Sequence, residues 1–516
     1  MDFFQYSKKS LIAFGESPLD SWTVDDAMKG TSIIGGTGSG KTSGSGRQIA
    51  LKFLKEGWGG LVLCAKSDEA KQWEEYCDEA GRSDDYIRFG KGCIHKSGAF
   101  QGQQIVFNPI DYELTREGDG AGETQNVTNI FMNIHRMGNR IANEGDTKDE
   151  RFWDVALKRC LNRTVELIKL AGEPLTYRNM VYVLRSCDRF DKKQLADATK
   201  DAIKGNLNNY SGKDVYCMYC LIKTYLNILN EPSSSENNIA FEMSLEYFLT
   251  TFRTMGEKTK ATISEMFMGL AEPFLSGLLF RHFSGVTNFF PEQIYGYNRF
   301  NKDDKRKIVL VLDFGIKEYL DAGIIAQCVF KLMFQQAVER RNVENFPTPV
   351  FLWCDEAQYF LNPYDQIFLT TARSSRTATV YLSQNISNYL AVMGAEKDGK
   401  ARVDSLMGNL STKIFHANSD AETNEYASRL IGDAVKLLTG TEESHPHFSM
   451  EKTESTSTRG EYMAQVRPKD FTVLKTGGMI NNFKVQAVIA VAGRKWANNK
   501  NYIRKTFTQK FRNYEQ

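Results

Sequence analysis

Eight residues near the start of the chain have the types and spacing of a loop that binds phosphate. They are Gly35-Gly36-Thr37-Gly38-Ser39-Gly40-Lys41-Thr42, preceded by Ser32-Ile33-Ile34. Glycines let successive backbone N–H groups point inward at phosphate oxygens, a curvature that Cβ atoms would obstruct. The pattern predicts a strand, a loop and a helix that begins near Lys41 with its positive end toward the anion. The alternative is a flexible Gly/Ser turn.

The side chains of this loop predict ATP and Mg²⁺ as ligands. Lys41 would reach the β and γ phosphates, and the Thr42 hydroxyl would bind Mg²⁺. The residues expected to contact the nucleotide are Gly35, Thr37, Gly38, Ser39, Gly40, Lys41, Thr42 and Ser43.

A pair of carboxylates follows a second apolar run. Val350 to Cys354 is expected to be a buried central strand, and Asp355-Glu356 come directly after it. Asp355 is suited to hold Mg²⁺ through water, while Glu356 is suited to polarise the attacking water. With the phosphate loop, this pair predicts an ATPase rather than a kinase. Taken alone, it could be an ordinary strand that ends in surface acids.

A third set of polar residues follows the next predicted strand. Gln384 falls at the tip of the strand from Ala378 to Leu382, where its amide could hydrogen-bond both the γ-phosphate and the attacking water. Arg373 or Arg376, just before that strand, could act on the site of a neighbouring subunit as an arginine finger. Each arginine could equally be a surface residue, and the residues alone do not choose between the two.

The composition of the chain is that of a large globular protein. It has 516 residues, of which 41% are hydrophobic and 25% charged, and a net charge of +2. A charge this small confines any nucleic-acid contact to particular loops or a channel. No apolar run approaches the roughly 18 residues that span a bilayer, so we expect a cytoplasmic protein that meets a membrane only through a partner.

The nine cysteines are scattered and odd in number, which does not suit a disulfide framework. Cys217 and Cys220 form a CxxC pair without a second pair or a matching pair of histidines. We therefore expect them to be buried helix residues rather than zinc ligands.

Apolar, β-rich runs alternate with amphipathic helical stretches. Alternation of this kind predicts an α/β fold, here a RecA-like P-loop nucleotide-binding domain with a mainly parallel sheet and helices on both faces. After the phosphate loop, the expected strands are Gly60–Cys64, Gln104–Phe107, Ile308–Asp313, Val350–Cys354, Thr379–Leu382, Lys413–Phe415 and Lys484–Ala492.

A long segment without strand patterns separates the two ATPase motifs, and its apolar residues recur at helical spacing. It predicts an inserted all-α domain over 149–250. The nucleotide-binding domain would then comprise 1–148, with the phosphate loop, and 251–516, with the carboxylate pair and the C-terminal strands.

Two other segments have unusual composition. Gly440 to Glu461 is Ser/Thr-rich and charged and is expected to be a long loop, either disordered or facing a channel or partner. The basic stretch from Arg494 to Arg512 carries interleaved aromatic residues. It could bind nucleic acid, although a solvated edge strand and tail is the more common explanation.

Together these residues resemble the type IV secretion coupling proteins, the TraG-like conjugative DNA-transfer ATPases related to the FtsK and HerA motors. The resemblance covers most of the chain. It rests on the phosphate loop, the Asp355-Glu356 pair, Arg373 eleven residues before Gln384, and two further segments, Phe107-Asn108-Pro109-Ile110-Asp111 and the pattern from Arg467-Pro468-Lys469-Asp470-Phe471 to Gly493-Arg494.

The resemblance implies a DNA-pumping homo-hexamer with ATP between subunits and Arg373 as the arginine finger in trans. It implies that the all-α insertion recognises relaxosome-like or secretion-substrate proteins. The chain departs from the family in three places. It begins almost at the nucleotide domain, without the usual transmembrane helices. Cys64-Ala65-Lys66-Ser67-Asp68-Glu69 replaces a DPKGE-like motif, and Arg376 stands where a glycine is common.

Three functions follow from these observations. The first is an ATP-hydrolysing DNA translocase that recruits and pumps DNA or a DNA–protein complex in conjugative transfer. The second is the same motor in a mobile-element or defence system. The third is an ATP-gated platform that docks proteins without processive movement. The sequence leaves open the strandedness of the DNA, the direction of movement, the number of subunits and the identity of the partners.

Overall fold

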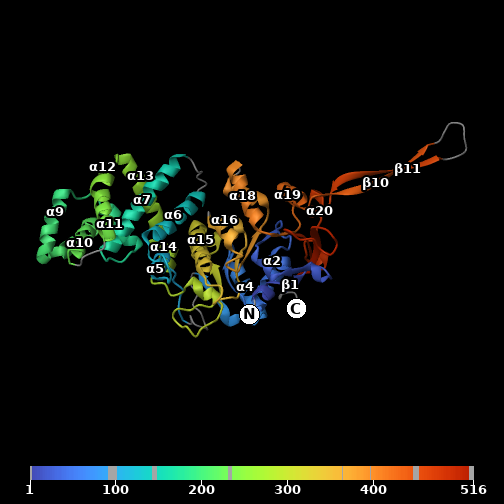
Figure 1. Ribbon diagram of the computed structural model, residues 1–516, viewed down its shortest axis with the longest axis horizontal. Helices are drawn as coiled ribbons and strands as arrows, with labels where there is room; N and C mark the ends of the chain where they lie inside the picture. Colours follow the sequence, from blue (N-terminus) through green and yellow to red (C-terminus); the bar gives the residue numbers. More distant parts are fainter. Residues whose placement is uncertain are drawn as a thin grey trace.

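The computed structural model describes residues 3–90, 102–141, 148–230, 235–362, 364–394, 397–444 and 453–510. The molecule is elongated (Figure 1). A bundle of helices forms one end, a sheet covered by helices forms the middle, and a two-stranded hairpin projects from the other end.

The central sheet has nine strands in the order β13-β12-β9-β3-β8-β7-β4-β6-β5. The strands from β9 to β5 run parallel, and β12 pairs antiparallel with both β9 and β13. Their bounds are β3 Thr31–Ile34, β4 Gly59–Leu63, β5 Tyr86–Gly90, β6 Val309–Asp313, β7 Val350–Cys354, β8 Thr377–Ser383, β9 Thr412–Phe415, β12 Lys484–Val491 and β13 Tyr502–Thr508. Two hairpins stand apart, β1 Ser10–Ala13 with β2 Ser21–Thr23, and β10 Asp433–Ser444 with β11 Thr453–Ala464.

The central strands are buried throughout because both faces of the sheet are covered. Along β7, Leu352 belongs to one hydrophobic core and its neighbours Phe351 and Trp353 belong to the other, as the two-residue period of a strand requires. One core is rich in aromatic rings, among them Phe53 stacked on Trp58 with centroids 4.6 Å apart. The α/β class predicted from the alternating runs is confirmed.

Helices cover the sheet and form the bundle at one end (Figure 1). Those beside the sheet are α1 Phe3–Ser7, α2 Val24–Met28, α3 Arg47–Lys55, α4 Ser67–Glu79, α15 Ile316–Arg340, α16 Tyr364–Thr371, α17 Ile386–Met393, α18 Lys397–Asn409, α19 Ala421–Ile431 and α20 Pro468–Thr472. Those in or next to the bundle are α5 Pro109–Thr115, α6 Thr124–Ile141, α7 Lys148–Leu170, α8 Tyr177–Ser186, α9 Lys192–Asp201, α10 Tyr216–Asn230, α11 Ser235–Glu246, α12 Phe252–Thr254, α13 Glu257–Ala271 and α14 Gly277–Phe283.

The bundle contains the predicted insertion. Within 149–250 the described residues form helices and short turns without strands, and helices continue on both sides, from α6 to α14. The boundaries 1–148, 149–250 and 251–516 stay a prediction. Cys217 and Cys220 are buried in α10, as expected.

One predicted strand is wrong, and β5 of the main sheet lies outside the prediction, as do the strands of the two hairpins. Residues Gln104 to Phe107 form no strand, because their backbone bonds to the last turn of α14 and to the loop after it. The Phe107 N–H donates to the His282 carbonyl at 2.8 Å, and Asn288 bonds Val106 in both directions. In sequence order, the third parallel strand of the main sheet is β5. The polar Arg88 interrupts its apolar run.

The predicted loop from Gly440 to Glu461 is also wrong where the structure describes it. β10 and β11 pair antiparallel from Asp433–Ala464 to Ser444–Thr453 and project from the body as an arm (Figure 1). Residues 445–452 lie outside the described residues. The basic C-terminal stretch contains β13, which is an edge strand of the main sheet, as the alternative to nucleic-acid binding predicted. Residues 511–516 lie outside the described residues.

Among the described helices, none is by itself both long and apolar enough to cross a membrane. One pair, Glu257–Phe274 with Gly277–Phe283, meets the requirement of length and composition only when its two members are taken together, and it is bent by 68°.

Candidate nucleotide-binding site

The glycine-rich loop follows β3 and leads into α3, as predicted. Gly38 and Gly40 have φ angles of 73° and 80°, in the left-handed region that glycine adopts without steric cost. A Cβ on Gly40 would lie 2.5 Å from a methyl group of Val485. The helix after the loop begins with a π-helical turn over Thr42–Gly46 and continues as α3. The loop is therefore tightly curved, with glycine required at its bends.

The order of the strands explains how three distant segments meet. β8 lies between β3, which carries the loop, and β7, which carries the carboxylates. Because these strands are parallel, their carboxyl ends share one edge of the sheet. Gln384, just after β8, is therefore placed between the two motifs. The Thr37 hydroxyl donates to its Oε1 at 3.3 Å, and its Nε2 donates to Glu356 Oε1 at 3.1 Å.

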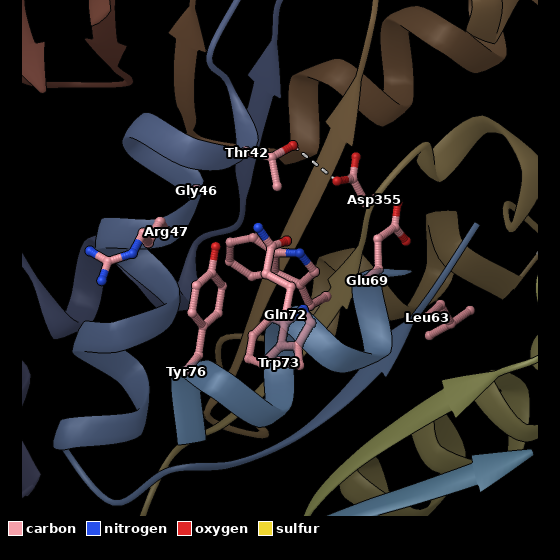
Figure 2. Close-up of a pocket in the computed structure, with 10 residues that line it drawn as sticks. Thr42, Gly46, Arg47, Leu63, Glu69, Gln72, Trp73, Tyr76 and Asp355 are labelled. Atoms are coloured by element: carbon pink, nitrogen blue, oxygen red, sulfur yellow. Dashed lines mark hydrogen bonds between the residues drawn. The ribbon is translucent and has the colours of Figure 1, made fainter. Parts of the chain in front are cut away.

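The carboxylate pair meets the phosphate loop directly. The Thr42 hydroxyl donates to Asp355 Oδ2 at 3.0 Å, although the two residues are 313 positions apart (Figure 2). The Lys41 Nζ lies 3.8 Å from Glu356 Oε1. Lys41, Asp355 and Glu356 are buried, and Thr42 is half-buried. The convergence of Lys41, Thr42, Asp355 and Glu356 that the sequence predicted is present in the structure.

Glu356 is held in a strained backbone conformation. Its φ and ψ are 48° and 51°, unusual for a residue with a side chain. Its carboxylate accepts a hydrogen bond from Gln358 Nε2 at 3.0 Å in addition to that from Gln384. Gln358 in turn accepts one from the Ser383 hydroxyl. Strain supported by a closed set of hydrogen bonds is characteristic of residues that must be aimed at a reacting group.

The residues present fit a triphosphate with a divalent cation. Burial raises the pKa of Asp355, and the pKa of Glu69, whose carboxylate lies beside it in Figure 2, is raised by burial and then by the charge of Asp355. Clustered buried carboxylates call for a cation. A hydroxyl plus one carboxylate suits Mg²⁺, which keeps most of its waters; no cluster of three or more acidic, His or Cys ligands occurs within the described ranges. The Ser39 hydroxyl, buried in the loop, has no hydrogen-bond partner among the described groups.

A small hollow lies beneath the loop. It measures about 10 Å³ and is lined on its polar side by Thr42, Asp355 and Glu69 and on its apolar side by Trp73, Tyr76 and Trp353 (Figure 2). A hollow of this size is at the lower limit for one water molecule.

The two arginines have different environments. The side chain of Arg373 is 62% exposed and pairs through Nε and Nη2 with Asp25 at 3.0 and 2.9 Å. It makes none of the described contacts with the nucleotide site of its own chain. Arg376 instead donates to the carbonyls of Val343 and Pro347 and stacks on Phe3, with its guanidinium 3.6 Å from the ring centre.

Several residues of the site were not in the sequence prediction. Glu69 follows the end of β4 at the same edge of the sheet, so the rule that identified Asp355 could have found it. Gln358 contacts Glu356 only because of the turn after β7. Gln509, just after β13, donates to the Ser43 hydroxyl at 2.7 Å, a contact between chain ends that no local pattern indicates.

The fold and the glycine-rich loop define a RecA-like P-loop protein with a candidate nucleotide-binding site. Residues 349–474 match the family described as the TraM recognition site of TraD and TraG. No curated protein matches the chain in sequence.

The fold is similar to solved structures of a conjugative coupling protein. For the unbound bacterial conjugative coupling protein TrwB (TrwBdeltaN70), the TM-score is 0.55 at 12% identity, over 99% of this chain and 92% of that chain. TrwB with ADP and Mg²⁺ gives 0.54 at 12% identity over the same shares, and TrwB with the ATP analogue ADPNP gives 0.51 at 14%, over 94% and 87%. The resemblance to TraG-like coupling proteins is thereby confirmed, in fold over nearly the whole chain and in sequence over 349–474.

Proposed function

We propose that the chain is an ATP-hydrolysing DNA translocase that recruits and pumps DNA or a DNA–protein complex in conjugative transfer. The convergence of Lys41, Thr42, Asp355, Glu356 and Gln384 at one edge of the sheet carries this proposal. The likeness to TrwB, a bacterial conjugative coupling protein whose structure has been solved with ADP and Mg²⁺, supports the assignment of process and ligands.

The roles of the side chains follow from their positions. Mg²⁺-ATP, when bound, supplies the γ-phosphoryl group that is transferred. Lys41 neutralises negative charge that develops on phosphate oxygens, and Thr42 with Asp355 forms the cation site. Glu356 accepts the proton of the attacking water, and Gln384, bonded to Glu356, orients that water. Gly35, Thr37, Gly38, Ser39, Gly40 and Ser43 form the cradle.

The proposed assembly is a homo-hexamer in which Arg373 completes the site of the next copy. Its exposure and its single surface ion pair leave it accessible for that role, whereas Arg376 is engaged with its own chain. The proposed partners are DNA and relaxosome-like or secretion-substrate proteins, the latter through the helical bundle. Contact with a membrane would be made through a partner.

The deciding experiment is DNA-stimulated ATP hydrolysis by the purified chain across a range of salt concentrations. We expect stimulation that weakens with salt and that Lys41→Ala abolishes. Lys55→Ala, an exposed lysine at the end of α3, is the matched control and is expected to behave like the unmodified chain. Hydrolysis that DNA does not stimulate at any salt concentration would contradict the proposal.

Glu356→Gln separates a motor from a docking platform. It is expected to keep ATP binding and lose hydrolysis by about 10² to 10⁴-fold, the usual contribution of a general base. A motor then stops moving on DNA. Unchanged association with protein partners, together with absence of movement by the unmodified chain, would favour the platform. Electron microscopy with DNA and a non-hydrolysable ATP analogue would count the subunits.

A further inference from the structure

A groove of about 330 Å³ lies on the helical bundle. The bundle, which contains α7 and α11, is at the end of the molecule opposite the β10–β11 arm (Figure 1). The groove runs between α7 and α11, which pack against each other. Its lining combines apolar and charged side chains: Val155, Lys158, Arg159, Asn162, Arg163, Met243 and Glu246.

The apolar side chains of the groove belong to two exposed stripes. On α7, Phe152 and Val155 are 60% and 70% exposed and lie one turn apart. On α11, Ile239 and Met243 are 58% and 49% exposed, again one turn apart. The opposite faces of both helices pack inward, so these four side chains are not required for the core of the bundle. Val155 and Met243 line the hollow, and Phe152 and Ile239 extend the apolar surface one turn along each helix, which indicates an interaction site rather than scattered surface residues.

The charges around the groove favour an acidic occupant. Lys158 and Arg159 have no acidic partner among the described residues, and Arg163 is held by Glu166 at 2.8 Å. Glu246 is the acidic residue of the lining. Positive charge therefore dominates, and the carboxylates of an occupant would meet two cations without acidic partners at the rim, of which Arg159 also lies 5.4 Å from the centre of the Tyr247 ring.

One buried polar atom of the groove lacks a partner. Asn162 lines the hollow, and its Oδ1 is buried without a hydrogen-bond donor in the described part of the chain. An atom this deeply buried belongs to the floor of the groove and is not a contact for an occupant. The apolar side chains and the basic rim together match one face of a polypeptide.

We propose that this groove docks an acidic amphipathic helix of a partner protein. Apolar residues of that helix, spaced three and four apart, would pack on Val155 and Met243 while its flanking carboxylates meet Lys158 and Arg159. DNA fits less well, because its backbone carries no apolar face and would approach Glu246. The inference deepens the protein-partner part of the proposed function and rests on that part alone.

The test uses two synthetic peptides of about 18 residues with the same leucine stripe, labelled with fluorescein. One has Glu on its flanks and the other has Lys. Fluorescence anisotropy with the full chain is expected to show binding of the acidic peptide, at least about tenfold tighter than the basic one. Arg159→Glu and Met243→Glu are each expected to weaken it at least about tenfold, the loss of a hot-spot contact.

Matched controls lie on the same bundle. Lys193→Glu on α9 and Ile203→Glu, with 59% exposure, make the same chemical changes outside the groove and are expected to leave binding unchanged. Circular dichroism and ATP hydrolysis, expected to be unchanged in all four variants, separate failed docking from failed folding and from failure of the proposed ATPase.

Three results would overturn the inference: no binding of the acidic peptide, equal binding by the groove variants and the controls, or tighter binding of the basic peptide. A labelled oligonucleotide that binds, and whose binding Arg159→Glu abolishes, would assign the groove to nucleic acid instead. A change in sedimentation coefficient confined to the groove variants would assign it to contact between copies of the chain.

Discussion

The Thr42 hydroxyl donates to Asp355 at 3.0 Å and so joins the phosphate loop to the carboxylate strand across 313 positions of sequence. Two parallel strands with β8 between them bring the two residues to one edge of the sheet. The contact fixes the side-chain oxygen of Thr42 and the carboxylate of Asp355 where a single cation can meet both.

This contact predicts different outcomes for two substitutions of Thr42. Thr42→Ala removes the hydroxyl and is expected to lower ATP hydrolysis about 10²-fold or more, since loss of a cation ligand removes several kcal/mol of charge stabilisation. Thr42→Ser keeps the hydroxyl and is expected to stay within a few-fold of the unmodified chain. Phosphate release measured against Mg²⁺ concentration checks both, and equal rates for the two variants would remove Thr42 from the cation site.

Arg373 and Arg376 are expected to separate into a functional and a structural residue. Arg373→Ala is expected to lower turnover about 10³-fold, as loss of an arginine finger does, with nucleotide affinity kept. The change in unfolding free energy is expected to stay below about 1 kcal/mol, because the Asp25 pair is on the surface. Arg376→Ala removes two bonds from a charged group to carbonyls and is expected to cost about 1.5–3 kcal/mol of stability.

A mixing experiment tests whether Arg373 acts in trans. Assemblies of Arg373→Ala alone and of Lys41→Ala alone are both expected to be inactive. Mixed assemblies contain sites with an intact Lys41 on one copy and an intact Arg373 on the next, so they are expected to recover part of the activity. Mixed assemblies as inactive as either variant would place Arg373 outside the neighbouring site, and loss of turnover in Arg376→Ala without loss of stability would exchange the two roles.

A buried ion pair anchors the segment that follows Glu356. Lys331 Nζ lies 2.6 Å from Asp365 Oδ1, both side chains are almost inaccessible, and Gln335 and Tyr381 also donate to Asp365. Lys331→Met leaves the Asp365 charge buried and is expected to cost about 3–5 kcal/mol of unfolding free energy. Lys200→Met breaks an exposed pair with Asp197 and is expected to cost less than about 1 kcal/mol. Urea titrations compare the two, and similar losses would contradict an anchoring role.

The sequence predicted the parts of the fold that depend on continuous burial. β4, β6 and β7 are apolar runs and β8, β9 and β12 contain shorter ones, because helices cover both faces of the sheet. β5 was not predicted as a strand, because Arg88, which pairs with Asp313, interrupts its apolar run. Gln104 to Phe107 was wrongly predicted to be a strand. An apolar run indicates that a segment is buried, but it does not indicate which backbone groups the segment bonds to.

The residues of the site likewise fall into those that the sequence predicted and those that it did not. Lys41, Thr42, Asp355, Glu356 and Gln384 could be predicted because each stands at a fixed offset from a strand end, and parallel strand ends meet. The arm was predicted to be a loop because much of β10 and β11 is polar. These two strands are stabilised by pairing with each other and not by burial. Gln358 and Gln509 depend on a turn and on a contact between chain ends, which no periodicity records.

His416 links the stability of the phosphate loop to pH. It is buried at the end of β9, its Nε2 lies 2.7 Å from the Ser45 hydroxyl, and its Nδ1 lies 3.2 Å from the Gln486 carbonyl. Burial lowers its pKa to about 3. In the unfolded chain the pKa is about 6.5, so below that pH the unfolded chain binds a proton that the folded chain does not. The stability that depends on neutral His416 is therefore complete above about pH 6.5 and is lost as the pH falls toward 3.

At pH 5 this loss is expected to reach about 2 kcal/mol relative to pH 8. His416→Gln cannot take up the proton, and its stability is expected to fall by about 2 kcal/mol less over the same interval. Urea titrations of both proteins at pH 8 and pH 5 measure the difference. His282, whose pKa burial also lowers, is present in both proteins and cancels in the comparison. Equal losses for the two proteins would mean that His416 is already able to bind a proton in the folded chain.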